Sequence, residues 1–183
     1  MRRFVHLLIC CVAVSLFASC HRSADVPPVG SGNKQWVNQD FEGLWGWVSS
    51  DKAASITQEK AHSGRYSLTV GPGVEYSATF GAPLGQLSDT KPRKINITAW
   101  VWVPNAESTA ILVVQVGGPQ GNVMWDGLRL SNKINTYGKW VQLNEHIMLS
   151  PNIAYEHGLS VYLWSQSTPA PVYLDDLVIT EAE

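Results

Sequence analysis

The chain has 183 residues, of which 45% are hydrophobic, and this is enough for one domain with its own core. Its 13 basic and 15 acidic residues give a formal net charge of −2 at pH 7, which argues against nucleic acid as a partner because nucleic-acid-binding proteins concentrate positive charge. The cysteines are Cys10, Cys11 and Cys20, so the chain beyond them can have neither a disulfide nor a cysteine–zinc site.

The N-terminus has the pattern of a secretory signal. Arg2 and Arg3 precede an apolar run over residues 4–18, which is shorter than the roughly 20 residues that a membrane-spanning helix needs. The sequence Leu16-Phe17-Ala18-Ser19-Cys20 resembles the lipobox of bacterial lipoproteins, in which the cysteine is lipidated and becomes the new N-terminus. The alternative is an ordinary cleaved signal followed by a spare thiol.

We therefore expect a signal peptide over residues 1–19 and a lipid on Cys20, with the protein held at a bacterial membrane in the cell envelope, periplasmic or at the cell surface. Loss of the signal leaves 11 basic against 15 acidic residues. The segment 20–34 is rich in proline and glycine, which predicts a flexible tether. Residues 35–183 are expected to form the domain.

The domain sequence consists of short apolar stretches separated by turn residues, which predicts an all-β fold. The clearest strand covers residues 94–103, where small aliphatic residues alternate with larger or polar ones and the aliphatic set is expected to face the core. Further strands are expected at residues 66–70, 74–80, 110–117, 122–130, 140–148, 158–166 and 171–180. Their spacing favours two packed antiparallel sheets in a jelly-roll sandwich.

Four segments, in this order, resemble parts of the jelly-roll carbohydrate-binding modules of bacterial glycanases, which are galactose-binding-like sandwiches that include xylan- and cellulose-binding groups. The resemblance implies that a poly- or oligosaccharide binds to the concave sheet face. It also implies a structural calcium ion, with Glu42 and Asp175 as side-chain ligands and backbone carbonyls near residues 62–64 completing the shell. The segments are Asp40-Phe41-Glu42-Gly43 with Trp45, then residues 61–68, Gly138-Lys139-Trp140-Val141 and Val172-Tyr173-Leu174-Asp175-Asp176-Leu177.

A candidate binding face follows from alternation within the predicted strands. Its residues occupy positions that would be polar on a plain solvent-exposed face, and aromatic rings among amides suit a sugar, whose C–H faces stack on rings while its hydroxyls bond to amides. Trp125 is expected at the rim, with Asp126 as a neighbouring carboxylate. The residues expected on this one sheet face are Trp100, Trp102, Gln115, Trp125, Tyr162, Trp164 and Gln166.

Two other interpretations of this face stay open. A loop could cover it, which would make Trp100 and Trp102 ordinary packing residues. Alternatively, the same face could bind another cell-envelope protein, which would give the chain a structural or assembly role. Ile111 and Val113, expected on the same face as Gln115, favour a protein interface over a sugar groove.

Catalysis is not expected, because the carboxylates of the chain are isolated in sequence. A glycosidase needs two carboxylates roughly 5–10 Å apart, and adjacent Asp175 and Asp176 should point to opposite faces of a strand. The less favoured alternatives are a glycosidase or a polysaccharide lyase, the latter using Tyr162 with His146 or His157.

Overall fold

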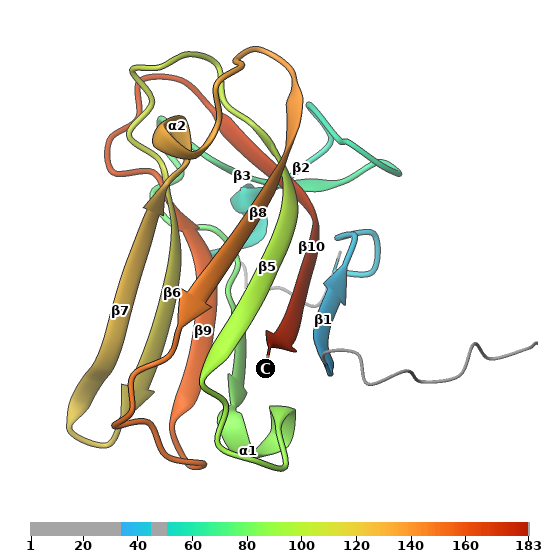
Figure 1. The fold of residues 1–183 in the computed structure, drawn as a ribbon. Helices are drawn as coiled ribbons and strands as arrows, with labels where there is room; N and C mark the ends of the chain where they lie inside the picture. The colour runs from blue at the N-terminus through green and yellow to red at the C-terminus, as the bar shows by residue number, and fades with distance from the viewer. Residues whose placement is uncertain (1–33, 45–50, 183) are drawn as a thin grey trace, which may run out of the picture. The chain divides into compact units, whose positions relative to one another are not determined.

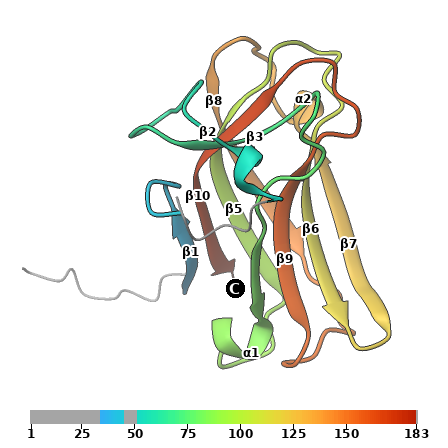
Figure 2. The ribbon, with the colours of Figure 1, turned by 180° about the vertical axis from the view of Figure 1, so that it is seen from behind.

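Ten β-strands form two antiparallel sheets in the part of the chain that the computed structural model describes, residues 34–44 and 51–182. Figures 1 and 2 show the two sheets from opposite sides. The expected all-β sandwich is therefore confirmed. The predicted signal peptide, Cys20 and nearly all of the tether lie outside the described residues. Within those residues, no helix has the length and apolar character needed to cross a membrane.

The first sheet contains β2 (Ile56–Thr57), β3 (Ser67–Val70), β10 (Val172–Ala182), β5 (Lys94–Trp102) and β8 (Trp140–Met148), in that order, and β1 (Gln35–Gln39) pairs with β10. Because β5 pairs along one edge of β10, β3 and β1 share the other edge. They occupy different parts of that edge, at residues 172–174 and 177–180. Near the junction of these parts, the register of β10 with β5 shifts between Asp175 and Val178.

The second sheet contains β4 (Phe80–Pro83), β9 (Gly158–Trp164), β6 (Ile111–Gly118) and β7 (Gly121–Arg129), in that order. Three short helical turns complete the fold: η1 (Ala53–Ser55), α1 (Leu84–Leu87) and α2 (Leu130–Lys133). They are too short to contradict the expectation of a chain without regular helices.

The core lies between the sheets and follows the predicted alternation. On β5, Ile95, Ile97, Ala99 and Val101 are at most 1% exposed. On β9, Leu159, Val161 and Leu163 are also buried, so the same period-two pattern places an apolar row inside from each sheet.

The strand expected at residues 74–80 is wrong in its position. Only isolated bridges occur at Val74 and Tyr76, and the regular strand begins at Phe80. Side-chain hydroxyls, instead of backbone carbonyls, accept some of the backbone hydrogen bonds here. The Ser77 hydroxyl accepts a bond from the Leu163 N–H, and the Ser55 hydroxyl accepts one from the Ala78 N–H.

Candidate functional site

The predicted ligand-binding residues lie on two different sheets. Trp100 and Trp102 belong to β5 of the first sheet, whereas Tyr162 and Trp164 belong to β9 of the second. The expectation of one shared face is therefore wrong. Alternation correctly predicted that all four point away from the core, but the outer faces of two packed sheets lie on opposite sides of a sandwich.

The loop of residues 58–66 packs against Trp100 and Trp102. The His62 ring stacks on Trp100 with centroids 3.8 Å apart and an interplanar angle of 11°. The Lys60 ammonium lies 4.8 Å from the centroid of the Trp102 ring, and Trp140 contacts the same ring edge-on at 6.1 Å. The loop thus covers part of both tryptophans, as one of the two open interpretations expected, and both stay partly exposed.

The outer face of the second sheet gathers the other predicted residues in three cross-strand rows. Ile111 of β6 lies between Trp164 and Arg129, Val113 between Tyr162 and Gly127, and Gln115 between Ser160 and Trp125. Gln166 lies two residues after Trp164, the last residue of β9. We call this surface the aromatic face, and it is made of Tyr76, Gln115, Asn122, Trp125, Arg129, Ser160, Tyr162, Trp164 and Gln166.

Tyr76 joins the aromatic face although the sequence analysis did not select it. Its ring stacks on Trp164 with centroids 6.0 Å apart and meets Tyr162 edge-on at 6.1 Å. The side chain is 39% exposed. Partial burial and the nearby Glu75 carboxylate raise the pKa of Tyr76, so its phenol is protonated at neutral pH. Because Tyr76 lies in an irregular segment outside the regular strands, strand alternation does not indicate which way its side chain points.

Trp125 lies over a glycine on the same strand. A Cβ atom placed on Gly127 would lie 2.4 Å from Cη2 and 2.8 Å from Cζ3 of the Trp125 ring, so the ring fills the space that a side chain would need. The ring is nevertheless 47% exposed. Asp126, in contrast, lies opposite the buried Val114 and is not on the aromatic face, so its expected role beside Trp125 is wrong.

The apolar residues of β6 do not make this face an apolar surface. Ile111 is 5% and Val113 is 0% exposed, because the longer side chains of the neighbouring strands cover them. Because Ile111 and Val113 are covered, they do not favour a protein interface over a sugar groove.

Polar groups occupy the spaces between the rings. The Tyr162 hydroxyl donates to Gln115 Oε1 at 3.3 Å, and Gln115 Nε2 donates to Asn122 Oδ1 at 2.8 Å. In the row of Trp164, Arg129 Nη2 donates to Gln166 Oε1 at 2.6 Å. Rings and hydrogen-bonding groups thus alternate across the face.

The two predicted calcium ligands both contact the loop that precedes β3. Glu42 Oε1 accepts the N–H groups of Arg65 and Tyr66, each at 2.7 Å. Asp175, which is 0% exposed, accepts the N–H groups of His62 and Ser63 through Oδ2 at 2.7 and 3.1 Å. The first and last segments of the domain therefore meet here, as the resemblance implied.

Asp176 also contacts this loop. Its Oδ2 lies 2.6 Å from His62 Nδ1, and its Oδ1 accepts the Ser63 hydroxyl at 2.6 Å. The expectation that Asp175 and Asp176 point to opposite faces is wrong, because the register shift and the positive φ of Asp176, 48°, turn both carboxylates toward the loop.

The arrangement around Glu42 and Asp175 does not match the ligand shell of a calcium ion. Calcium needs six to eight oxygen ligands, but the loop presents N–H groups rather than carbonyls to Glu42 Oε1 and Asp175 Oδ2. Among the described residues, no three His, Cys, Asp or Glu side chains cluster as a metal site. The calcium ion stays a prediction of the resemblance that this hydrogen-bonded arrangement does not favour.

The histidines considered for a lyase do not join Tyr162. His146 lies on β8 of the first sheet and bonds to Asn96. His157 Nδ1 accepts the Ala154 N–H at 3.0 Å, while the Tyr162 hydroxyl bonds to Gln115. Neither expected Tyr–His pair is formed.

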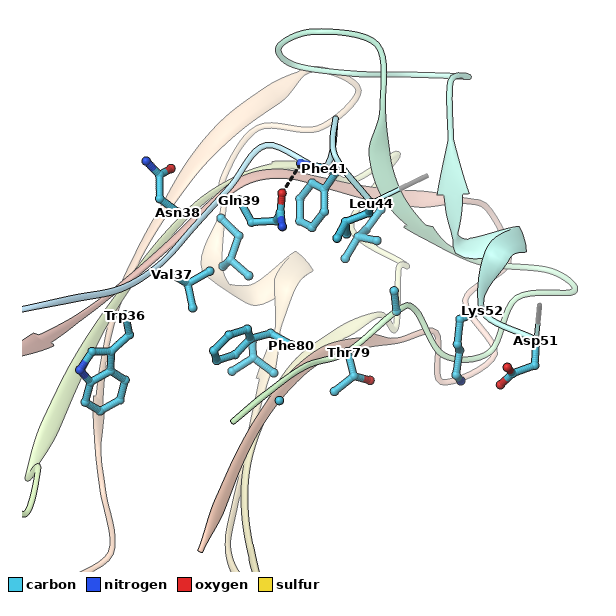
Figure 3. A pocket seen from close by; sticks show the side chains of 15 residues that line it. Trp36, Val37, Asn38, Gln39, Phe41, Leu44, Asp51, Lys52, Thr79 and Phe80 are labelled. Atoms are coloured by element: carbon cyan, nitrogen blue, oxygen red, sulfur yellow. Dashed lines mark hydrogen bonds between the residues drawn. The ribbon is translucent and has the colours of Figure 1, made fainter. Parts of the chain in front are cut away.

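A concave region with a volume of about 730 Å³ lies between β1 and β4, away from the aromatic face. Figure 3 shows Trp36, Val37 and Phe80 lining it. It also borders Leu44 and Asp51, which flank residues 45–50. Those residues, including the predicted packing residue Trp45, lie outside the described part of the chain, so this region is assigned no ligand.

Comparison with known proteins relates this chain to carbohydrate-binding modules through its fold. No protein-family model and no curated protein matches the sequence. Among solved structures, the C-terminal family 22 carbohydrate-binding module of Clostridium thermocellum Xyn10B matches with a TM-score of 0.52 and 14% identity, over 82% of this chain and 95% of the module. The CBM22-1 xylan-binding domain of Paenibacillus barcinonensis Xyn10C matches with a TM-score of 0.44 and 21% identity, over 70% and 80% of the two chains. The described domain therefore shares its β-sandwich fold with the Clostridium thermocellum module, as its sequence motifs indicated.

Proposed function

We propose that this protein binds a poly- or oligosaccharide on the aromatic face without catalysing a reaction. The observation that carries the proposal is the half-exposed Trp125 ring over Gly127, adjacent to the hydrogen-bonded amides of Gln115 and Asn122. A pyranose presents C–H groups that pack on such a ring, while its hydroxyls exchange hydrogen bonds with the amides.

The polar groups between the rings favour a glycan over a protein partner. A protein interface buries apolar residues at its centre, but here the apolar Ile111 and Val113 are already covered. The accessible groups around Trp125 are amides and hydroxyls, which a sugar can satisfy. The fold shared with the Clostridium thermocellum module, for which cleft residues are described as acting in ligand binding, supports the same class of ligand.

The test is a screen of the purified protein against immobilised plant and bacterial polysaccharides, followed by titration of the glycan that binds. Trp125→Ala should reduce affinity at least about tenfold, since it removes a stacking platform. Tyr155→Ala is the matched control, because Tyr155 is also an exposed aromatic residue, at 50%, but lies outside the aromatic face. Absence of binding to any glycan, or equal affinity of Trp125→Ala and wild type, contradicts the proposal.

We also propose that the domain is held in the cell envelope by a lipid on Cys20. The support is the charged and apolar N-terminus followed by Leu16-Phe17-Ala18-Ser19-Cys20. Metabolic labelling with a radioactive fatty acid should label the wild-type protein and not Cys20→Ala. Equal labelling, or none in the wild type, contradicts the anchor.

A further inference from the structure

The Arg129 side chain forms a hydrogen bond with a residue from the other side of the β6 row on the aromatic face. It extends from β7, on one side of Ile111, to bond with Gln166, which follows β9 on the other side. This bond of 2.6 Å joins side chains from the two sides of the row that contains Ile111 and Trp164. The guanidinium is thus held on the face rather than extended into solvent.

The partner of this guanidinium is a neutral amide. Among the described residues, the ion pairs are Lys34–Asp89, His62–Asp176 and Lys133–Glu145, and none involves Arg129. An arginine has five N–H donors in a planar fork that matches a carboxylate, and Gln166 Oε1 accepts from only one nitrogen of that fork. In the same row, the buried indole N–H of Trp164 has no hydrogen-bond partner. This end of the face therefore has N–H donors without a charged partner, and the Glu75 carboxylate at this end lies beside Tyr76.

The backbone that presents Gln166 is strained. Gln166 and Ser167 have consecutive positive φ angles of 47° and 59°, a conformation that non-glycine residues rarely adopt. The Thr109 hydroxyl bonds to the carbonyls of Ser165 and Gln166 at 3.2 and 2.8 Å, and Thr168 N–H donates to the Ser165 carbonyl at 2.9 Å. These bonds fix the turn and direct the Gln166 amide toward Arg129, and such strain is often kept where it positions a binding group.

We infer that Arg129, oriented by Gln166, binds a carboxylate, and that the glycan recognised by the aromatic face carries a uronic acid. This inference rests on the proposed function and names its ligand class. Bidentate pairing of a guanidinium with a carboxylate gives both affinity and geometric selectivity. Because the chain as a whole is acidic, this selectivity must come from the local pair and not from long-range attraction.

The test uses glucuronoxylan, polygalacturonate and alginate, each in its native form and after chemical reduction of its carboxyl groups. At least one native form should bind at least tenfold more tightly than its reduced counterpart. Arg129→Gln should abolish that difference. Gln166→Glu should abolish it too, because a glutamate would pair with Arg129 and repel the ligand carboxylate. Lys133→Gln, which removes a positive charge elsewhere, should preserve it, and thermal melting checks that each variant is folded.

The outcomes separate the two proposals. Equal binding of native and reduced glycans, with loss of both in Trp125→Ala, would leave glycan binding in place and overturn the carboxylate site. Discrimination that survives in folded Arg129→Gln would overturn the role of Arg129. Dextran sulfate is the control for a different anion, and tighter binding to it than to every uronic-acid glycan would contradict the carboxylate as the recognised group. Failure of every acidic and neutral glycan to bind would overturn both proposals.

Discussion

The Trp125 ring occupies the space above Gly127 that any other side chain at that position would fill. Two strand positions apart on β7, the two residues point to the same face, and the glycine lets the indole approach the sheet while it stays 47% exposed. The position of the ring therefore depends on the absence of a Cβ at residue 127.

Gly127→Ala should displace the Trp125 ring and weaken glycan binding by about fivefold, which corresponds to about 1 kcal/mol of lost stacking. Because φ of Gly127 is not positive, alanine is compatible with the backbone, and the fold should persist. Isothermal titration measures the affinity, and Gly43→Ala, where a Cβ meets nothing within 4 Å, is the control. Unchanged affinity in Gly127→Ala would show that the ring position does not matter.

Asp175→Ala should destabilise the domain by about 3 kcal/mol, because the His62 and Ser63 N–H groups that donate to this buried carboxylate would lose their acceptor. In a chain of this size, that corresponds to a fall in melting temperature of roughly 6–12 °C. Differential scanning calorimetry measures it. A shift as small as that of an exposed substitution would show that the His62–Ser63 loop is held by other contacts.

The titration of Asp175 should affect stability in the opposite direction to that of an exposed, ion-paired carboxylate. Burial raises the pKa of Asp175, and hydrogen bonds from Ser63, His62 and Asp176 offset part of that effect. A carboxyl with a raised pKa in the folded state contributes stability below its unfolded pKa of about 3.9, and this contribution is lost as the pH rises through the folded pKa. The free energy of unfolding of the wild type, relative to Asp175→Asn, should therefore increase as the pH falls from about 7 to about 4. A constant difference would contradict the raised pKa.

Chelation should not lower the melting temperature, because N–H groups of the loop already donate to Glu42 Oε1 and Asp175 Oδ2. Linkage makes this a sensitive test, since any ion that binds only the folded state stabilises it. Melting with EDTA and with added calcium gives the measurement. Stabilisation by calcium would show that the ion replaces these hydrogen bonds and would support the resemblance.

Alternation in the sequence predicted the buried row of each long strand, and it predicted that Trp100, Trp102, Tyr162 and Trp164 point outward. It could not assign them to sheets, because a period of two is identical in β5 and β9 and the pairing of strands depends on contacts far apart in the chain. The space that Gly127 leaves for the Trp125 ring and the stacking of Tyr76 on Trp164 also depend on the three-dimensional packing.

The motifs predicted more of the Glu42–Asp175 region than alternation did. They indicated that the first and last segments meet, which the pairing of β1 with β10 confirms. They did not reveal that Asp176 turns toward the same loop, because that follows from a bulge in β10 and a positive φ angle, neither of which has a distinct sequence pattern here.

The central claim is that glycan binds on the outer face of the second sheet and not beside Trp100 on the first. Calorimetric titration and thermal melting of Trp125→Ala and Trp100→Ala, with the same glycan, test it most directly. Trp125→Ala should lose at least about tenfold in affinity with little change in melting temperature, because its ring is half-exposed and lies outside the core between the sheets. Trp100→Ala should lower the melting temperature by several degrees, roughly as expected for a packing residue, and keep its affinity within about twofold. Loss of affinity in Trp100→Ala with full affinity in Trp125→Ala would place the site on the first sheet and contradict the account.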